Sequence, residues 1–272
     1  GAMVGAGVSL RSRRPSFRVR LESLRTVITP LSYGLNPLGR PRPSASAGLS
    51  LGSPTLLLDA SLLSGSDGDP IGTWTNTGSA GGSFTASGST RPTLQTAERN
   101  GKNVVRGDGT DDVLDGNTFA TYFGSSAKTI IAVVKTPASF GIHANVYDAP
   151  PWLADSGGYF GLHAVQRADN RYEAYNYDTA VDLVSLTLST STWYVLTYLH
   201  DGVDLKAAVD TAALSTIASG ATNALVGSIR LFRNYSTAYL AADIAMIVGW
   251  NSALNDTDRA NYRDQIRTYW GF

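Results

Sequence analysis

The chain has 272 residues, no cysteine and a formal net charge of zero. Without thiols it can form neither a disulfide nor a thiolate metal site, and this composition favours a reducing compartment. No segment is apolar for long enough to predict a membrane span, and no signal peptide is visible. Gly1 and Ala2, ahead of a native Met3, resemble the scar left when a protease removes a tag.

Residues 1–50 form a basic, proline-rich segment that we interpret as an extended arm. They contain eight arginines against a single acid, Glu22, so the arm carries +7 and the rest of the chain −7. Five of the eleven prolines lie here, which argues against a compact core. Only residues 17–24 alternate like a short strand.

Three roles are open for this arm. It could be a floppy leader, or an anchor that orders against a neighbouring subunit or a larger particle. Nucleic-acid binding is disfavoured because few aromatic residues lie between the arginines. The candidate anchoring residues are Arg11, Arg13, Arg14, Phe17, Arg18, Val19, Arg20 and Leu21.

Residues 51–272 have the texture of one all-β domain. Gly, Ser, Thr, Asn and Asp separate short apolar runs every 8–12 residues, which predicts a two-sheet antiparallel sandwich. The run at 129–136 is continuously apolar, as expected for a strand covered on both faces. Asp201-Gly202 predicts a hairpin and leaves His200 exposed beside its turn. The other predicted strands are 191–199, 203–209, 227–234 and 241–250.

One helix is predicted near the end of the chain, over residues 255–270. Asn255 can cap its first turn, and Gly271 follows as a stop. Apolar and aromatic residues recur at helical spacing, so one face should dock on the sandwich. The predicted core consists of Ile130, Ile131, Val133, Trp193, Val195, Leu231, Ile244, Ile247 and Trp250.

In this order, the elements resemble those of the concanavalin A-like lectin/glucanase superfamily, in its laminin-G-like jelly-roll branch. The resemblance rests on "LLLDAS…DGDPIGTWTNTG", "NGKNVVRGDGTDD", "KTIIAVVKT", "STWYVLTYLHDG" and the closing "ADIAMIVGWNSALNDTDRANYRDQIRTYWGF". It covers residues 56–272 and implies a jelly-roll sandwich. Chains with this opening and closing are similar to modules of phage virion proteins and bacterial surface proteins.

The stretch "RGDGTDDVLDG" at 106–116 has three interpretations. The favoured one is the hairpin turn that the resemblance implies, in which Gly107 and Gly109 supply positive φ and aspartates bond nearby amides. A calcium site is the second, with oxygens from Asp108, Asp111 and Asp112, although the EF-hand pattern is absent. The third is an integrin-binding tripeptide, which is short enough to occur by chance.

A second acidic pair could also hold calcium. Asp67 and Asp69 lie in "SGSDGDPIG", where a turn built from Gly, Asp and Pro is the favoured reading. Calcium is therefore the only cofactor for which the sequence offers candidates.

Catalytic residues are hard to assemble from this sequence. The family's retaining glucanases use carboxylates at Glu-x-Asp-x-Glu spacing, whereas the three glutamates here, Glu22, Glu98 and Glu173, stand far apart. Asp178 follows Glu173 at an odd offset, which places the two on opposite faces of a strand.

The three histidines are dispersed as well. His143 and His163 lie in strand-like contexts that favour a structural role, and no nucleophile elbow, phosphate loop or metal-spaced cluster is present. We therefore expect no enzymatic activity.

Aromatic residues offer a candidate ligand surface. Tyr175 and Tyr177 share one face of a predicted strand, and Asp178 follows them. Trp152 and Tyr159 lie on a predicted loop and could join them in binding sugar or protein. The alternative is that about half of these rings fill the core.

These observations favour a non-catalytic structural protein of a phage virion: a decoration, fibre or tail component attached through its arm and assembled in bacterial cytoplasm. Its expected partners are further copies of itself and other virion proteins. The alternative is a carbohydrate-binding module or a receptor-binding protein for a cell-surface glycan.

Overall fold

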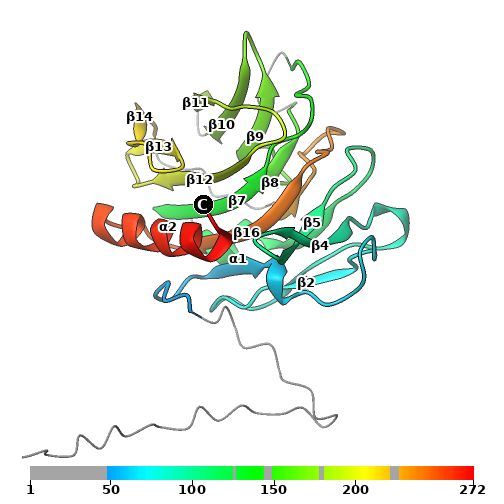
Figure 1. Cartoon of the computed structure of the whole chain (residues 1–272). Helices are drawn as coiled ribbons and strands as arrows, with labels where there is room; N and C mark the ends of the chain where they lie inside the picture. Colours follow the sequence, from blue (N-terminus) through cyan, green and yellow to red (C-terminus); the bar gives the residue numbers. More distant parts are fainter. Residues whose placement is uncertain (1–47, 125–126, 144–148, 178–180, 221–226) are drawn as a thin grey trace, which may run out of the picture. The chain divides into compact units, whose positions relative to one another are not determined.

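The computed structural model describes residues 48–124, 127–143, 149–177, 181–220 and 227–272. The residues predicted to anchor the arm lie outside these ranges. Within them, every pairing between named strands is antiparallel, and the strands form two sheets (Figure 1). No helix in the described part of the chain is long and apolar enough to cross a bilayer.

The first sheet has the order β14-β13-β12-β7-β16-β5-β4, and β1 also pairs with β16. The amino-terminal half of β16 pairs with β5, whereas its later residues pair with β1. The strands are β1 (Leu56–Asp59), β4 (Thr93–Arg99), β5 (Lys102–Arg106), β7 (Lys128–Lys135), β12 (Trp193–His200), β13 (Asp204–Val209), β14 (Ser215–Ala218) and β16 (Asp243–Trp250).

The second sheet has the order β11-β10-β9-β8-β15-β6-β3-β2. Its strands are β2 (Thr73–Thr75), β3 (Ser83–Thr85), β6 (Leu114–Thr118), β8 (Pro151–Asp155), β9 (Phe160–Gln166), β10 (Asn170–Tyr177), β11 (Val181–Thr187) and β15 (Ser228–Leu231). The helices are α1 (Phe119–Phe123) and α2 (Asp256–Trp270), with two 3-10 turns, η1 (Ala60–Leu62) and η2 (Gly88–Thr90). The predicted antiparallel sandwich with a carboxy-terminal helix is confirmed.

Strand β7 shows why the apolar run at 129–136 is continuous. Ile130 faces the core between the sheets, and Ile131 faces a second core that includes residues of α2. Both residues are fully buried. Alternating side chains of one strand therefore serve two different cores, which removes the usual polar alternation.

Helix α2 begins and ends as its sequence predicts. The Asn255 side chain accepts a hydrogen bond from the Asp258 amide at 2.9 Å, and Gly271 adopts a left-handed φ of 74°. Ile266 and Trp270 lie fully buried against the first sheet. The capping residue, the terminating glycine and the buried face of α2 therefore all agree with the prediction from the sequence.

Two predictions about burial are wrong. Trp193 is only partly buried, because it lies at the start of β12 with the Arg99 guanidinium 6.0 Å and the Lys135 ammonium 5.9 Å from its ring. His200 is fully buried, because β12 extends to it and turns its side chain inward. The predicted hairpin after His200 does form, with Gly202 at a φ of 101°.

The stretch "RGDGTDDVLDG" does not form the predicted hairpin. It leaves β5 in the first sheet and enters β6 in the second, so it is a crossover between sheets. Gly109 has the predicted positive φ of 79°. Gly107 is needed for space instead, since a Cβ there would lie 2.5 Å from the Leu240 carbonyl oxygen. Turn residues mark a change of direction without fixing which strands then pair.

The two burial patterns predict different mutational effects. Trp270→Ala should lower the free energy of unfolding by about 3–5 kcal/mol, because it empties the core beneath α2. Trp193→Ala should lower it by less than about 2 kcal/mol, because that ring is already partly hydrated. Urea denaturation of both variants checks this, and equal losses would place Trp193 in the core after all.

Candidate functional site

A hollow lined by tyrosines lies where β8, β9, β10 and β11 meet at their ends. We call it the tyrosine hollow; its volume is about 410 Å³. Its lining residues are Gly157, Gly158, Tyr159, Tyr175, Tyr177, Val181 and Tyr235. Hollows of this size that combine apolar walls with a few hydroxyls suit small ligands.

The turn between β8 and β9 positions one wall of the tyrosine hollow. Asp155 ends β8 fully buried, and its carboxylate accepts hydrogen bonds from the amides of Gly157, Tyr159 and Phe160 at 2.7–2.8 Å. Burial raises the pKa of the Asp155 carboxyl, and these amide donors counteract the rise. The sequence "DSGGYF" thus builds a tight turn that holds the Tyr159 ring in place.

The hairpin of β10 and β11 supplies the opposite wall. Tyr177 pairs with Val181, so both side chains lie on the same outward face. The Tyr177 and Tyr159 rings lie 5.8 Å apart and are inclined by 42°, and both side chains are half-buried. Tyr235 is 42% exposed. The hollow therefore presents aromatic surface together with phenol hydroxyls.

The predicted ligand residues divide into two groups. Tyr159, Tyr175 and Tyr177 do come together, although Tyr175 is 98% buried and its hydroxyl donates to the Gly158 carbonyl at 2.9 Å. Tyr175 thus positions the turn. Trp152 does not belong to the site: it lies in β8 and not on a loop, it is fully buried, and its indole donates to the Lys135 carbonyl.

Two further residues complete the comparison with the sequence. Asp178 lies outside the described residues. Tyr235, which sequence reasoning missed, reaches the hollow from the segment after β15. Its only signal is an aromatic residue in the polar stretch "RNYST". No periodic pattern could link it to β10.

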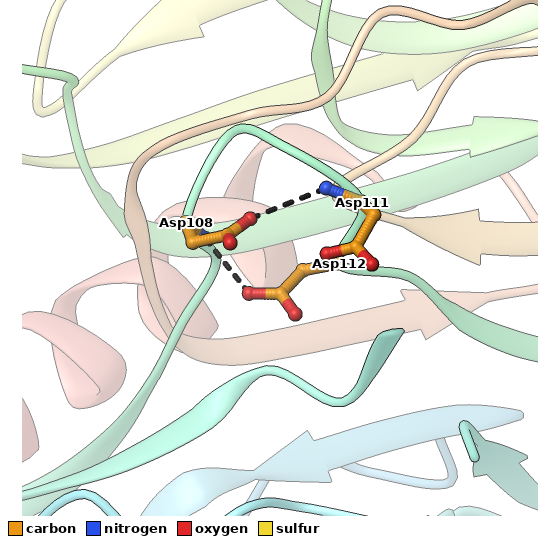
Figure 2. A group of neighbouring side chains, drawn as sticks. All are labelled: Asp108, Asp111 and Asp112. Atoms are coloured by element: carbon orange, nitrogen blue, oxygen red, sulfur yellow. Dashed lines mark hydrogen bonds between the residues drawn. The ribbon is translucent and has the colours of Figure 1, made fainter. Parts of the chain in front are cut away.

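The crossover after β5 gathers the candidate calcium ligands. Carboxylate oxygens of Asp108, Asp111 and Asp112 lie within 4.8 Å of one another. Figure 2 shows two of these side chains serving the loop: the Asp108 amide donates to Asp112, and the Asp111 amide donates to Asp108. Three carboxylates supply only part of the six to eight oxygens that calcium prefers, so the cluster fits calcium incompletely.

The Asp112 carboxyl is 4% exposed. Burial raises its pKa to about 6, and the neighbouring carboxylates of Asp108 and Asp111 add to the rise. Asp67 and Asp69 take no part in this cluster. Asp67 accepts a hydrogen bond from the Thr96 amide and Asp69 from the Ser66 amide, so both act as turn residues.

A serine, a histidine and an aspartate meet at the end of β12, a grouping that sequence reasoning missed. The Ser219 hydroxyl lies 3.3 Å from His200 Nε2 and 2.5 Å from Asp182 Oδ2. His200 Nδ1 accepts a hydrogen bond from the Gly202 amide, so the proton of the neutral ring is on Nε2, where Ser219 and the Gly220 backbone are its partners. A histidine in this tautomer cannot take a proton from the serine.

Two other buried polar side chains of the second sheet, Glu173 and His163, have clear partners. Glu173 is 99% buried, and the Arg167 guanidinium contacts both its oxygens at 3.0 Å. His163 bonds the Ala149 carbonyl through Nδ1, and burial lowers its pKa to about 4, which fits the structural role predicted for it. His143 lies outside the named strands, half-buried, with its carbonyl bound by Arg167.

Comparison with known proteins identifies the fold. No family model matches the chain, and no curated protein does. Among solved structures, the binding domain of Paraclostridial Mosquitocidal Protein 1 has a TM-score of 0.55 at 9% identity, covering 80% of this chain and 55% of that one. The botulinum neurotoxin type G receptor binding domain gives 0.54 at 9% identity, covering 81% and 54%.

Trypanosoma rangeli sialidase gives a TM-score of 0.52 at 12% identity, covering 86% of this chain and 35% of that one. The chain spans about half the length of the binding domains it matches. With the two-sheet topology, these likenesses show an antiparallel β-sandwich fold. At these identities they establish the fold alone.

The raised pKa of Asp112 predicts how stability depends on pH. The folded state holds this proton more tightly than the unfolded state, so its contribution is complete below about pH 4 and is lost as pH rises through about 6. Asn keeps an acceptor for the Asp108 amide and does not titrate.

Asp112→Asn should therefore gain stability relative to the unaltered protein, by about 2 kcal/mol, when both are moved from pH 4 to pH 7. Urea denaturation at the two pH values measures the difference. Asp69→Asn, in an exposed turn, is the control. If the difference in unfolding free energy between Asp112→Asn and the unaltered protein is the same at both pH values, burial does not raise the pKa of Asp112.

Proposed function

We propose that the β-sandwich is a recognition module that binds a carbohydrate, or a receptor bearing one, through the tyrosine hollow. The observation that carries this proposal is the pairing of the Tyr159 and Tyr177 rings beside the exposed Tyr235. An apolar sugar face can lie on such rings while its hydroxyls bond the phenols. Supporting it, the similar solved structures include domains named as binding or receptor-binding domains.

We also propose that the module has no catalytic activity. The tautomer of His200 argues against activation of Ser219, and the Glu173 carboxylate is held by Arg167. Incubation with β-glucans, agar and alginate should therefore release neither reducing ends nor unsaturated products. Product formation that Glu173→Gln or Ser219→Ala abolishes would contradict this.

A structural role in a phage virion, with the arm as the attachment, remains a separate hypothesis. It rests on the charge of residues 1–50 and on the resemblance noted in the sequence, and the comparisons do not bear on it.

That hypothesis makes its own prediction. Removal of residues 3–47 should leave a folded sandwich whose self-association is weaker, and the difference should shrink at high salt because arginine pairing is screened. Sedimentation of both forms at low and high salt measures it. Equal sedimentation in every buffer would contradict an anchoring arm.

The tyrosine hollow is tested by binding to an immobilised panel of neutral and acidic oligosaccharides. Tyr177→Ala should weaken binding to any captured glycan about ten-fold, or about 1.4 kcal/mol, because it removes one of the paired rings. The control is Tyr239→Ala, a half-buried tyrosine that lines a different hollow beside Asp108.

Both variants should unfold at temperatures close to that of the unaltered protein. Loss of binding in Tyr239→Ala alone would move the site to the hollow beside Asp108. Capture of no glycan at all would contradict the proposed function.

A further inference from the structure

Lys128 is a lysine with a buried side chain. It is the first residue of β7, is fully buried, and its Nζ has no hydrogen-bond partner among the residues that the structure describes. The Phe119 ring lies 5.4 Å away. Burial lowers the pKa of the Lys128 amine to about 7. An ammonium group without a carboxylate or a carbonyl is strongly disfavoured in such surroundings.

His200 lies beside Lys128 on the neighbouring strand. The two are directly paired across β7 and β12, so their side chains share the inward face. His200 is also fully buried. Burial lowers the pKa of its imidazole, and the charge of Lys128 lowers it further. A proton on either group therefore opposes a proton on the other.

The other titratable groups here do not neutralise Lys128. The Asp182 carboxylate accepts a hydrogen bond from the Ser219 hydroxyl, and the Asp155 carboxylate accepts hydrogen bonds from backbone amides. Neither is hydrogen-bonded to the Lys128 amine. Around these groups, α1 and β9 contribute rings without charge, Phe119 and Phe160. The other titratable groups around Lys128 and His200 are Tyr198 on β12, Tyr172 on β10, and Asp201 in the turn after β12.

The same strand ends carry the tyrosine hollow on their outer face. Asn176 and Asp182 are paired on the inner side, where both contact Ser219, while Tyr177 and Val181 are paired on the outer side. Ser219 also contacts His200 of the other sheet. The inner residues that contact Ser219 and the outer residues that line the hollow are therefore direct neighbours in the chain, Asn176 beside Tyr177 and Asp182 beside Val181.

We propose that acidification opens this end of the sandwich by placing charge on Lys128 and His200, and that it thereby weakens ligand binding at the tyrosine hollow. The binding part rests on the proposed function. The folded state binds the Lys128 proton less tightly than the unfolded state does. Lys128 therefore favours the closed state at alkaline pH, and this advantage is lost as pH falls through about 7. His200 acts in the same direction at lower pH.

Hydrogen exchange of backbone amides tests the opening without any ligand. Peptides from 128–135 and 193–205 are compared at pH 8 and pH 5.5, after correction for the intrinsic exchange rate. We expect the unaltered protein to lose protection about ten-fold or more on acidification, and Lys128→Met to lose clearly less, because only His200 still gains charge in that variant. The control is Lys102→Met, whose ammonium lies 4.5 Å from the Tyr269 ring, away from this end.

Equal losses in the unaltered protein and Lys128→Met, or no loss in either, would overturn the proposal. Should Lys128→Met fail to fold, carbon-13 titration of the lysine side chains decides the question in the unaltered protein. A Lys128 midpoint near 7 supports the opening, and one near the ordinary value of about 10.4 overturns it.

Binding to the oligosaccharide panel at pH 8 and pH 5.5 tests the consequence. The unaltered protein should bind about ten-fold more weakly at pH 5.5, and Lys128→Met should lose clearly less affinity, because only His200 still gains charge in that variant. If no oligosaccharide binds at either pH, the proposed function fails and hydrogen exchange alone decides the opening. If binding occurs with the same pH dependence in both proteins, the coupling is wrong and the recognition role stands.

Discussion

The whole domain depends on burial of the first sheet on both faces. β7 and β16 lie at its centre and are buried along nearly their full length, between the second sheet on one side and α2 on the other. A flat sheet covered on one side alone would leave Met246, Val248 and Trp250 in water. Helix α2 is therefore part of the core of the sandwich, and the Trp250 ring stacks on Tyr262 of this helix at 5.3 Å.

The elements that can be predicted from the sequence are those with a local signal. The limits of α2 follow from Asn255 and Gly271, and the continuous apolar run at 129–136 announces a strand buried on both faces. The crossover at 106–116 could not be predicted correctly, because a Gly- and Asp-rich turn is compatible with a hairpin and with a change of sheet. Pairing is a long-range property, and no residue of this stretch encodes it.

The candidate site shows the same division. Tyr175 and Tyr177 could be placed on one face from their spacing alone. The sequence could not predict which rings are exposed. Trp152 is buried at a register shift in β8, and Tyr235 lies in a different part of the chain. The contact of Ser219 with His200 and Asp182 joins three segments and leaves no pattern in the sequence. Tertiary contacts decide such groupings.

The pairing of β1 with β16 sets the order in which the domain can be completed. Leu56 lies opposite Gly249, so β1 must wait for a partner made about 190 residues later. At the usual speed of translation this takes roughly 10–40 s, during which the apolar β1 has no strand to pair with. Contacts of such long sequence separation slow folding. The first sheet is therefore closed by its late strands, and a nascent chain would present β1 to chaperones before the fold can bury it.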